Sequence, residues 1–197
     1  MNTLKIYQDE DAENPRTAWD NLGTFAYKHS RYRLGEEKIS EPIEWLEEKL
    51  GLQNQYEYSN ERLEELEQKF YAKFVAEPVY LYDHSSLALS TTPFGCNWDS
   101  GKVGYIYVER CKIREEYGWK RITKAREEQI VKYLQGEIET QNQYVSGDVY
   151  YFVIEDEDGD IVDSCGGFYG DDWEANGIKD CIPEELYPQL EDIEIEY

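Results

Sequence analysis

The chain has 197 residues, which is long enough to bury one sizeable hydrophobic core. Its 18 tyrosines and 5 tryptophans argue against extensive disorder, despite a mean hydropathy of -0.80. A formal net charge of -23 and a pI near 4.3 argue against direct binding to nucleic acid or to anionic membranes, and they favour a basic partner.

The first residues run into Gln8-Asp9-Glu10-Asp11 instead of an apolar signal-peptide segment, and no apolar run has the length of a membrane span. We therefore expect a cytoplasmic protein with reduced thiols. No two of the four cysteines are spaced C-x-x-C, which argues against a structural zinc site. We expect no metal and no cofactor.

The first half of the chain contains one short strand signal and two helix signals. Residues 4–7 are typical of a strand, and residues 19–27 of a packed loop or short strand. Residues 41–50 and 60–75 carry apolar side chains at helical spacing, and Gly51 is a natural end for the first helix.

The second half begins with residues 79–108, in which three strand patterns surround a long loop rich in turn residues. A third helix is expected over residues 123–139. Residues 147–155 give the strongest single strand signal, and the turn D-E-D-G-D returns the chain through Ile161-Val162 as a hairpin. Residues 184–190 are expected to form a short last helix.

These elements predict one α+β domain over residues 1–197. We expect a mainly antiparallel sheet built from the strands of residues 79–108 and 147–164, with about three helices packed against it. Residues 36–77 are expected to form a Glu-rich helical insertion, and residues 180–197 an acidic tail.

The loop within residues 79–108 offers one set of residues for thiol chemistry. Cys96 could be a nucleophile, His84 its base, and Asp83 or Asp99 the carboxylate that orients the base. We favour a structural alternative, in which Asp83, His84, Ser85 and Asp99 tie down the loop. In that alternative Phe94, Cys96 and Trp98 fill the core.

Other classes of site match the chain poorly. No P-loop, dinucleotide fingerprint, H-E-x-x-H or G-x-S-x-G motif occurs, and D-E-D-G-D lacks the first Asp and last Glu of an EF-hand. Asp83, Asp99 and His84 could hold a divalent metal, but no spacing rule supports this. Lys28, His29, Arg31 and Arg33 form a small basic cluster, which could be an anion site or a set of surface ion pairs.

Charge is distributed unevenly along the chain. Residues 36–77 hold 12 Glu against 5 Lys or Arg, and residues 155–197 hold 16 Asp or Glu against a single Lys. Residues 109–132 reverse the sign, with 8 Lys or Arg against 5 Glu. Solvated helix faces explain much of this acidity, but carboxylates on rigid elements could also imitate a line of phosphates.

Several motifs are similar to those of a family of small proteins encoded by bacteriophages and other mobile elements. They include D-N-L-G-T at residues 20–24, Y-D-H-S at 82–85 and F-x-C-x-W-D-S-G-x-V-G at 94–104. The likeness spans about residues 8–171, and the 36–77 region and the last 25 residues match it least. Gly166 stands where such proteins often have Trp after D-S-C. The resemblance implies a protein made inside a bacterial host cell, but no catalytic residue.

Acidity and this context together lead to the hypothesis of a non-enzymatic, DNA-mimic-like inhibitor. Its expected partner is a basic, nucleic-acid-binding host protein of a restriction or CRISPR-type system. The alternatives are a thiol-dependent hydrolase that uses Cys96 and His84, and a protein that binds a nucleotide signal at the basic cluster. The oligomeric state is left open. The carboxylates expected to contact the partner are Glu61, Glu64, Glu65, Asp156, Asp158, Asp171, Asp172 and Glu174.

Overall fold

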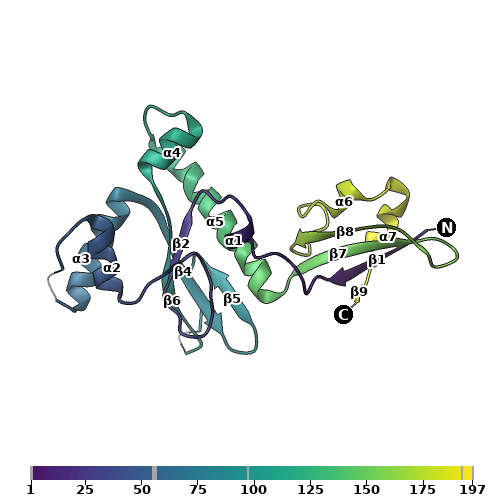
Figure 1. Ribbon diagram of the computed structural model, residues 1–197, viewed down its shortest axis with the longest axis horizontal. Helices are drawn as coiled ribbons and strands as arrows, with labels where there is room; N and C mark the ends of the chain where they lie inside the picture. Colours follow the sequence, from purple (N-terminus) through teal and green to yellow (C-terminus); the bar gives the residue numbers. More distant parts are fainter. Residues whose placement is uncertain (1, 55–56, 97, 192, 197) are drawn as a thin grey trace.

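The structure is a computed structural model that describes residues 2–54, 57–96, 98–191 and 193–196. It confirms the α+β class, with two antiparallel-rich sheets and helices packed on them (Figure 1). The strands are β1 (Thr3–Gln8), β2 (Thr24–Tyr27), β3 (Glu37–Lys38), β4 (Phe74–Asp83), β5 (Leu87–Ser90), β6 (Ser100–Glu109), β7 (Val149–Glu155), β8 (Ile161–Tyr169) and β9 (Ile195–Glu196). The helices are α1 (Pro15–Ala18), α2 (Pro42–Leu50), α3 (Asn60–Lys73), α4 (Arg110–Tyr117), α5 (Lys124–Ser146), α6 (Ile178–Cys181), the 3₁₀ turn η1 (Glu184–Leu186) and α7 (Tyr187–Glu191).

The first sheet has five strands in the order β3-β2-β6-β4-β5, and helices cover both of its faces. Side chains alternate between faces along a strand, so apolar residues are needed on both. On β6, Ile106 and Val108 face α5, whereas Tyr105 and Tyr107 face α2 and α3. This explains why residues 104–108 are buried without interruption.

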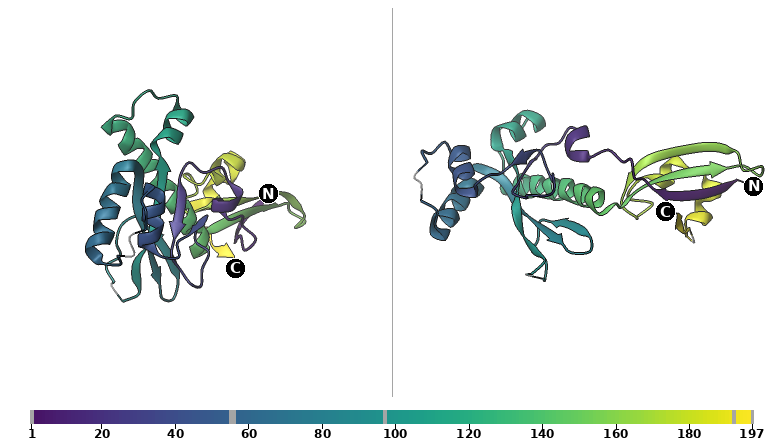
Figure 2. Two further views of the ribbon diagram at one scale, coloured as in Figure 1. Left: turned by 60° about the vertical axis from the view of Figure 1, so that its left-hand side comes forward. Right: turned by 60° about the horizontal axis from the view of Figure 1, so that its bottom comes forward.

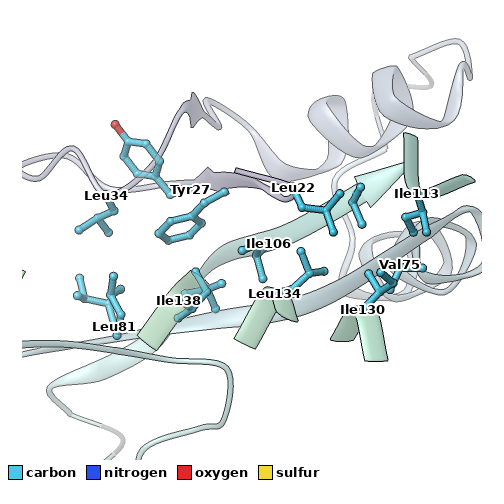
Figure 3. Packing of buried hydrophobic residues seen from close by; sticks show 14 residues of the cluster. Leu22, Tyr27, Leu34, Val75, Leu81, Ile106, Ile113, Ile130, Leu134 and Ile138 are labelled. Atoms are coloured by element: carbon cyan, nitrogen blue, oxygen red, sulfur yellow. The ribbon is translucent and has the colours of Figure 1, made fainter. Parts of the chain in front are cut away.

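Helix α5 supplies the apolar stripe that covers one face of this sheet. Ile130, Leu134 and Ile138 recur every four residues and are fully buried, with side chains directed toward the strand that carries Ile106 (Figure 3). Thr123 caps the start of the helix by accepting a hydrogen bond from the Arg126 amide.

The second sheet has four strands in the order β8-β7-β1-β9. The N-terminal strand β1 pairs antiparallel with β7, from Thr3 opposite Glu155 to Gln8 opposite Tyr150. α6, η1 and α7 cover one face of this sheet. The core between them is formed by Leu4, Ile6, Tyr150, Phe152, Ile154, Phe168, Ile178, Ile182, Leu186 and Leu190.

The two sheets lie at different positions along the long axis of the molecule, with α5 between them (Figures 1 and 2). Near the junction, hydrogen bonds tie the end of β1 to the point where α5 leads into β7. The Asp9 amide donates to the Val149 carbonyl at 2.7 Å, and the Gln8 side chain donates to the Gly147 carbonyl at the same distance. The ring of Trp19 also packs edge-on against Tyr169, with ring centroids 4.9 Å apart.

Several sequence predictions need correction. The strands of residues 79–108 and 147–164 do not share one sheet, because β7 pairs with the N-terminal β1 instead. The third helix runs to Ser146, seven residues beyond the predicted end, and α4 was not predicted. Residues 180–191 and 193–196 are not a free tail, because Ile182, Leu186 and Leu190 belong to the second core and β9 pairs with β1. Residues 192 and 197 lie outside the described residues, as do residues 55 and 56 of the expected insertion.

Candidate functional site

The residues considered for thiol chemistry meet where β4 ends and β6 begins. Asp99 lies between the other two groups, since its Oδ2 accepts a hydrogen bond from Cys96 Sγ at 3.5 Å and its Oδ1 is 3.6 Å from His84 Nδ1. The Asp83 amide donates to the Asp99 carbonyl at 2.8 Å. The hairpin therefore brings the four residues together, as the sequence suggested.

In space the carboxylate of Asp99 lies between the thiol and the imidazole, and this order does not suit nucleophilic catalysis. A base activates a thiol by taking its proton directly, so the imidazole must contact the sulfur. Here a carboxylate occupies that place, and the His84 side chain is 65% exposed on the far side of it. The geometry fits a hydrogen-bonded turn, which is also supported by a hydrogen bond from the Ser100 hydroxyl to the Cys96 carbonyl.

The suggested packing of this loop was wrong for Trp98. Its side chain is 96% exposed and does not fill the core. Phe94 is half-buried and packs against Tyr82, with ring centroids 5.8 Å apart. The intervening residue 97 lies outside the described residues.

We predict that Cys96 reacts with iodoacetamide no faster than the exposed Cys165, because the group that accepts its S–H hydrogen bond is the Asp99 carboxylate and not the His84 imidazole. Cys111 should react more slowly than Cys165, since a hydrogen bond to Glu109 raises the pKa of its thiol. Mass spectrometry of partly labelled protein measures the four rates. Faster labelling at Cys96 that disappears in a His84→Ala variant would revive the hydrolase alternative.

The basic cluster is mostly engaged in internal contacts. Arg31 forms an ion pair and hydrogen bond with Asp83, and Lys28 lies 3.5 Å from the Glu41 carboxylate. His29 stacks on Tyr32 and accepts hydrogen bonds from the amides of Arg31 and Tyr32 through Nδ1. This arrangement favours surface ion pairs over an anion site.

The acidic residues on α3 stand on a well-anchored helix. Glu61, Glu64 and Glu65 lie on its exposed side, while Leu66 and Phe70 are fully buried. Glu65 already has two basic partners, since Lys69 and Arg62 donate hydrogen bonds to it, and these bonds lower the pKa of its carboxyl group. The carboxylates of Glu61 and Glu64 have no basic partner among the described residues.

The acidic residues of the second sheet divide into two further groups. Asp156 and Asp158 form the β7–β8 turn, where Asp156 Oδ1 accepts the amides of Asp158 and Asp160. Asp171, Asp172 and Glu174 lie in the loop after β8. Asp172 Oδ1 accepts the Glu174 amide at 3.1 Å, and the Glu174 carboxylate lies 3.4 Å from Lys179.

The predicted partner-binding residues are therefore not one cluster. α3 lies near one end of the long axis and the β7–β8 turn at the other, with the loop after β8 between them (Figures 1 and 2). A basic partner would have to be extended, or would contact only one of the three groups.

A surface groove beside α5 was not predicted from the sequence. Two pockets of about 420 and 430 Å³ share Trp19, Gly136 and Thr140 in their walls. The remaining walls come from α1 and the loop after it, from α5, and from the end of β8 with the loop that follows it. No local pattern joins three segments so distant in the chain. The one hint in the sequence was Trp19, a large aromatic residue in a segment without a regular apolar pattern.

No cluster of three or more His, Cys, Asp or Glu side chains is arranged to hold a metal ion within the part of the chain that the structure describes. In the same residues, every helix is too short or too polar to cross a lipid bilayer. Comparisons with protein-family models, with curated proteins and with solved structures each found no match.

Proposed function

We propose that this protein is a non-enzymatic inhibitor that binds a basic, nucleic-acid-binding protein by presenting carboxylates in place of phosphates. The exposed carboxylates that have no basic partner carry the proposal. Among the described residues these include Glu61 and Glu64 on α3, Asp158 in the β7–β8 turn and Asp171 after β8. The three segments that carry them lie at separate positions along the long axis of the molecule, which has a net charge of -23 (Figure 1).

Rigidity makes this arrangement suitable for mimicry. Duplex DNA presents roughly one charge per 1.7 Å along a stiff axis. α3 is held in place by its buried residues and by the buried ion pair between Arg62 and Glu47, at 2.7 Å. Its carboxylates are therefore positioned before a partner arrives, which reduces the entropy cost of binding.

The basic region of the chain does not oppose this mode of binding. α4 and the start of α5 hold most of the local positive charge, and they project away from both α3 and the second sheet (Figure 1). A partner that contacts α3 or the second sheet would therefore meet mainly carboxylates, and long-range attraction would speed the encounter.

The resemblance to proteins of bacteriophages supplies the biological context of the proposal. A mobile element benefits from blocking host enzymes that cut its DNA, and these enzymes bind nucleic acid through basic surfaces. We therefore propose a restriction or CRISPR-type system in the bacterial host as the target.

Charge reversal tests this function. We expect the wild-type protein to restore plating of a susceptible phage on a restricting or CRISPR-immune host. The triple variant Glu61→Lys/Glu64→Lys/Asp171→Lys should lose this effect, because it replaces three unpaired carboxylates on the proposed binding surfaces. In binding assays, the log–log salt slope should fall by about 0.7–0.9 for each carboxylate that no longer takes the place of a phosphate.

The matched control is Glu115→Lys/Glu116→Lys/Glu128→Lys. It changes the net charge by the same amount on exposed positions of α4 and the start of α5. It should keep its activity. If both variants restore phage plating equally well, these carboxylates are not the binding surface. If the wild-type protein restores plating on no such host, the proposed target is wrong.

A further inference from the structure

A glycine of α5 lines the groove beside this helix. Gly136 lies inside α5, and a Cβ atom added there would meet nothing within 4 Å. Two aromatic side chains, Trp19 and Tyr133, also line the groove, and they are 46% and 49% exposed. The groove therefore has an apolar floor and aromatic walls.

The loop that closes one side of the groove is held firmly against α5. Gly170 has a φ of +88°, and a Cβ atom there would lie 2.6 Å from the Gln143 side chain. The Asn176 side chain donates to the Gly170 carbonyl at 2.7 Å. Glycine suits this left-handed backbone conformation, and the hydrogen bond from Asn176 holds the residue that immediately precedes Asp171 and Asp172.

The rim of the groove is predominantly acidic. Asp20, Glu139, Asp171 and Asp172 line it, against the single basic residue Lys132. Glu139 and Asp171 have no basic partner among the described residues. An apolar groove with aromatic walls and an acidic rim is complementary to a cation that carries a flat or apolar body.

We propose that this groove binds an arginine side chain from an exposed basic segment of a partner protein. The guanidinium would stack on Trp19 and pair with Asp171 or Glu139, while its aliphatic stem would cover Gly136. Arginine fits better than lysine because its planar group stacks on aromatic rings and can donate several hydrogen bonds at once. The same kind of stacking occurs within this molecule, where Arg126 lies over the Trp119 ring at 4.6 Å.

This inference rests on the proposed function, since it gives the basic partner a defined anchoring point. It differs from that function in its dependence on shape. General attraction between charges needs no groove and does not distinguish arginine from lysine. An arginine pocket needs the groove and prefers arginine to lysine.

The test uses fluorescently labelled nona-arginine and nona-lysine peptides with the full-length protein at physiological ionic strength. We expect nona-arginine to bind more tightly, and Gly136→Trp to reduce its affinity by about 30-fold, the scale of one desolvated cation–π contact. Trp19→Ala should remove the preference for arginine.

Gln129→Trp is the matched control. It adds the same large side chain at an exposed position of α5 that does not line the groove, so it should bind nona-arginine like the wild type. Gly136→Trp should also fold, and its thermal midpoint checks this.

If nona-arginine and nona-lysine bind the wild type equally well, and Gly136→Trp binds them as tightly as the wild type does, the groove is not an arginine site. That result would leave the proposed function intact. If neither peptide binds even at low salt, both the groove and the electrostatic function fail.

Discussion

Replacing Arg16 with methionine should lower the free energy of unfolding by about 3–5 kcal/mol, the usual cost of removing one member of a buried ion pair. The Arg16 side chain is only 1% exposed. It donates to Glu137 at 2.9 Å, to the Gly23 carbonyl at 2.7 Å and to Asn21 at 3.2 Å, and it pairs with Glu36. This guanidinium therefore links α1, the start of β2 and the middle of α5.

The cost arises because the variant leaves carboxylates in a poorly solvated site. Glu137 is itself 8% exposed, and it also accepts the Leu22 amide at 2.7 Å. Adding Glu137→Gln to Arg16→Met should recover part of the stability, since glutamine keeps the acceptor oxygen and removes the charge.

Urea denaturation followed by circular dichroism measures both effects. The control is Arg31→Met, which breaks the exposed ion pair with Asp83 and should cost about 0–1 kcal/mol. A destabilisation at Arg16 no larger than that at Arg31 would show that the network does not hold these elements together.

Replacing Phe70 with alanine should cost a similar amount, about 3–5 kcal/mol, through a different mechanism. The ring is fully buried where α3 meets the first sheet. Its centroid lies 5.3 Å from those of Trp45 and Tyr105, and 4.7 Å from that of Phe74. The substitution removes this packing and leaves a cavity, because a cluster supplied by two helices and a sheet cannot collapse freely.

Two further variants make the test specific. Phe70→Leu keeps most of the volume and should cost less than the alanine variant. Trp98→Ala also removes a large aromatic side chain, but from a position that is 96% exposed, so the change should stay within about 0.5 kcal/mol. If Phe70→Ala and Trp98→Ala have equal effects, α3 is not anchored as described.

Local patterns predicted the helices of the first half well. The apolar stripes of α2 and α3 and the glycine after α2 place these helices within two residues of their observed bounds. The β7–β8 hairpin was also predicted correctly from its turn residues, with Gly159 at a φ of +84°. In each case the signal lies within the element itself.

The division into two sheets could not be predicted in this way. It depends on pairing between Thr3–Gln8 and Val149–Glu155, which lie at opposite ends of the chain. Strand patterns show that a segment is extended, but they do not show which segment it pairs with. The burial of Leu186 and Leu190 was missed for a different reason. The many acidic residues around them dominate the composition of the segment and suggest an exposed tail.

The candidate sites show the same limit. Sequence proximity correctly suggested that Cys96, His84 and Asp99 meet, but their order in space depends on side-chain directions set by the hairpin. The groove beside α5 combines Trp19, Gly136 and Asp171, which only the folded chain brings together.

The most direct test of the proposed function is competition between this protein and duplex DNA for a partner captured from a bacterial lysate at low salt. The proposal predicts a nucleic-acid-binding partner that is released at high salt and displaced by DNA, with affinity falling linearly in log–log plots against salt. A partner that binds this protein and DNA at the same time, or that stays bound regardless of salt, would contradict mimicry of phosphates by carboxylates.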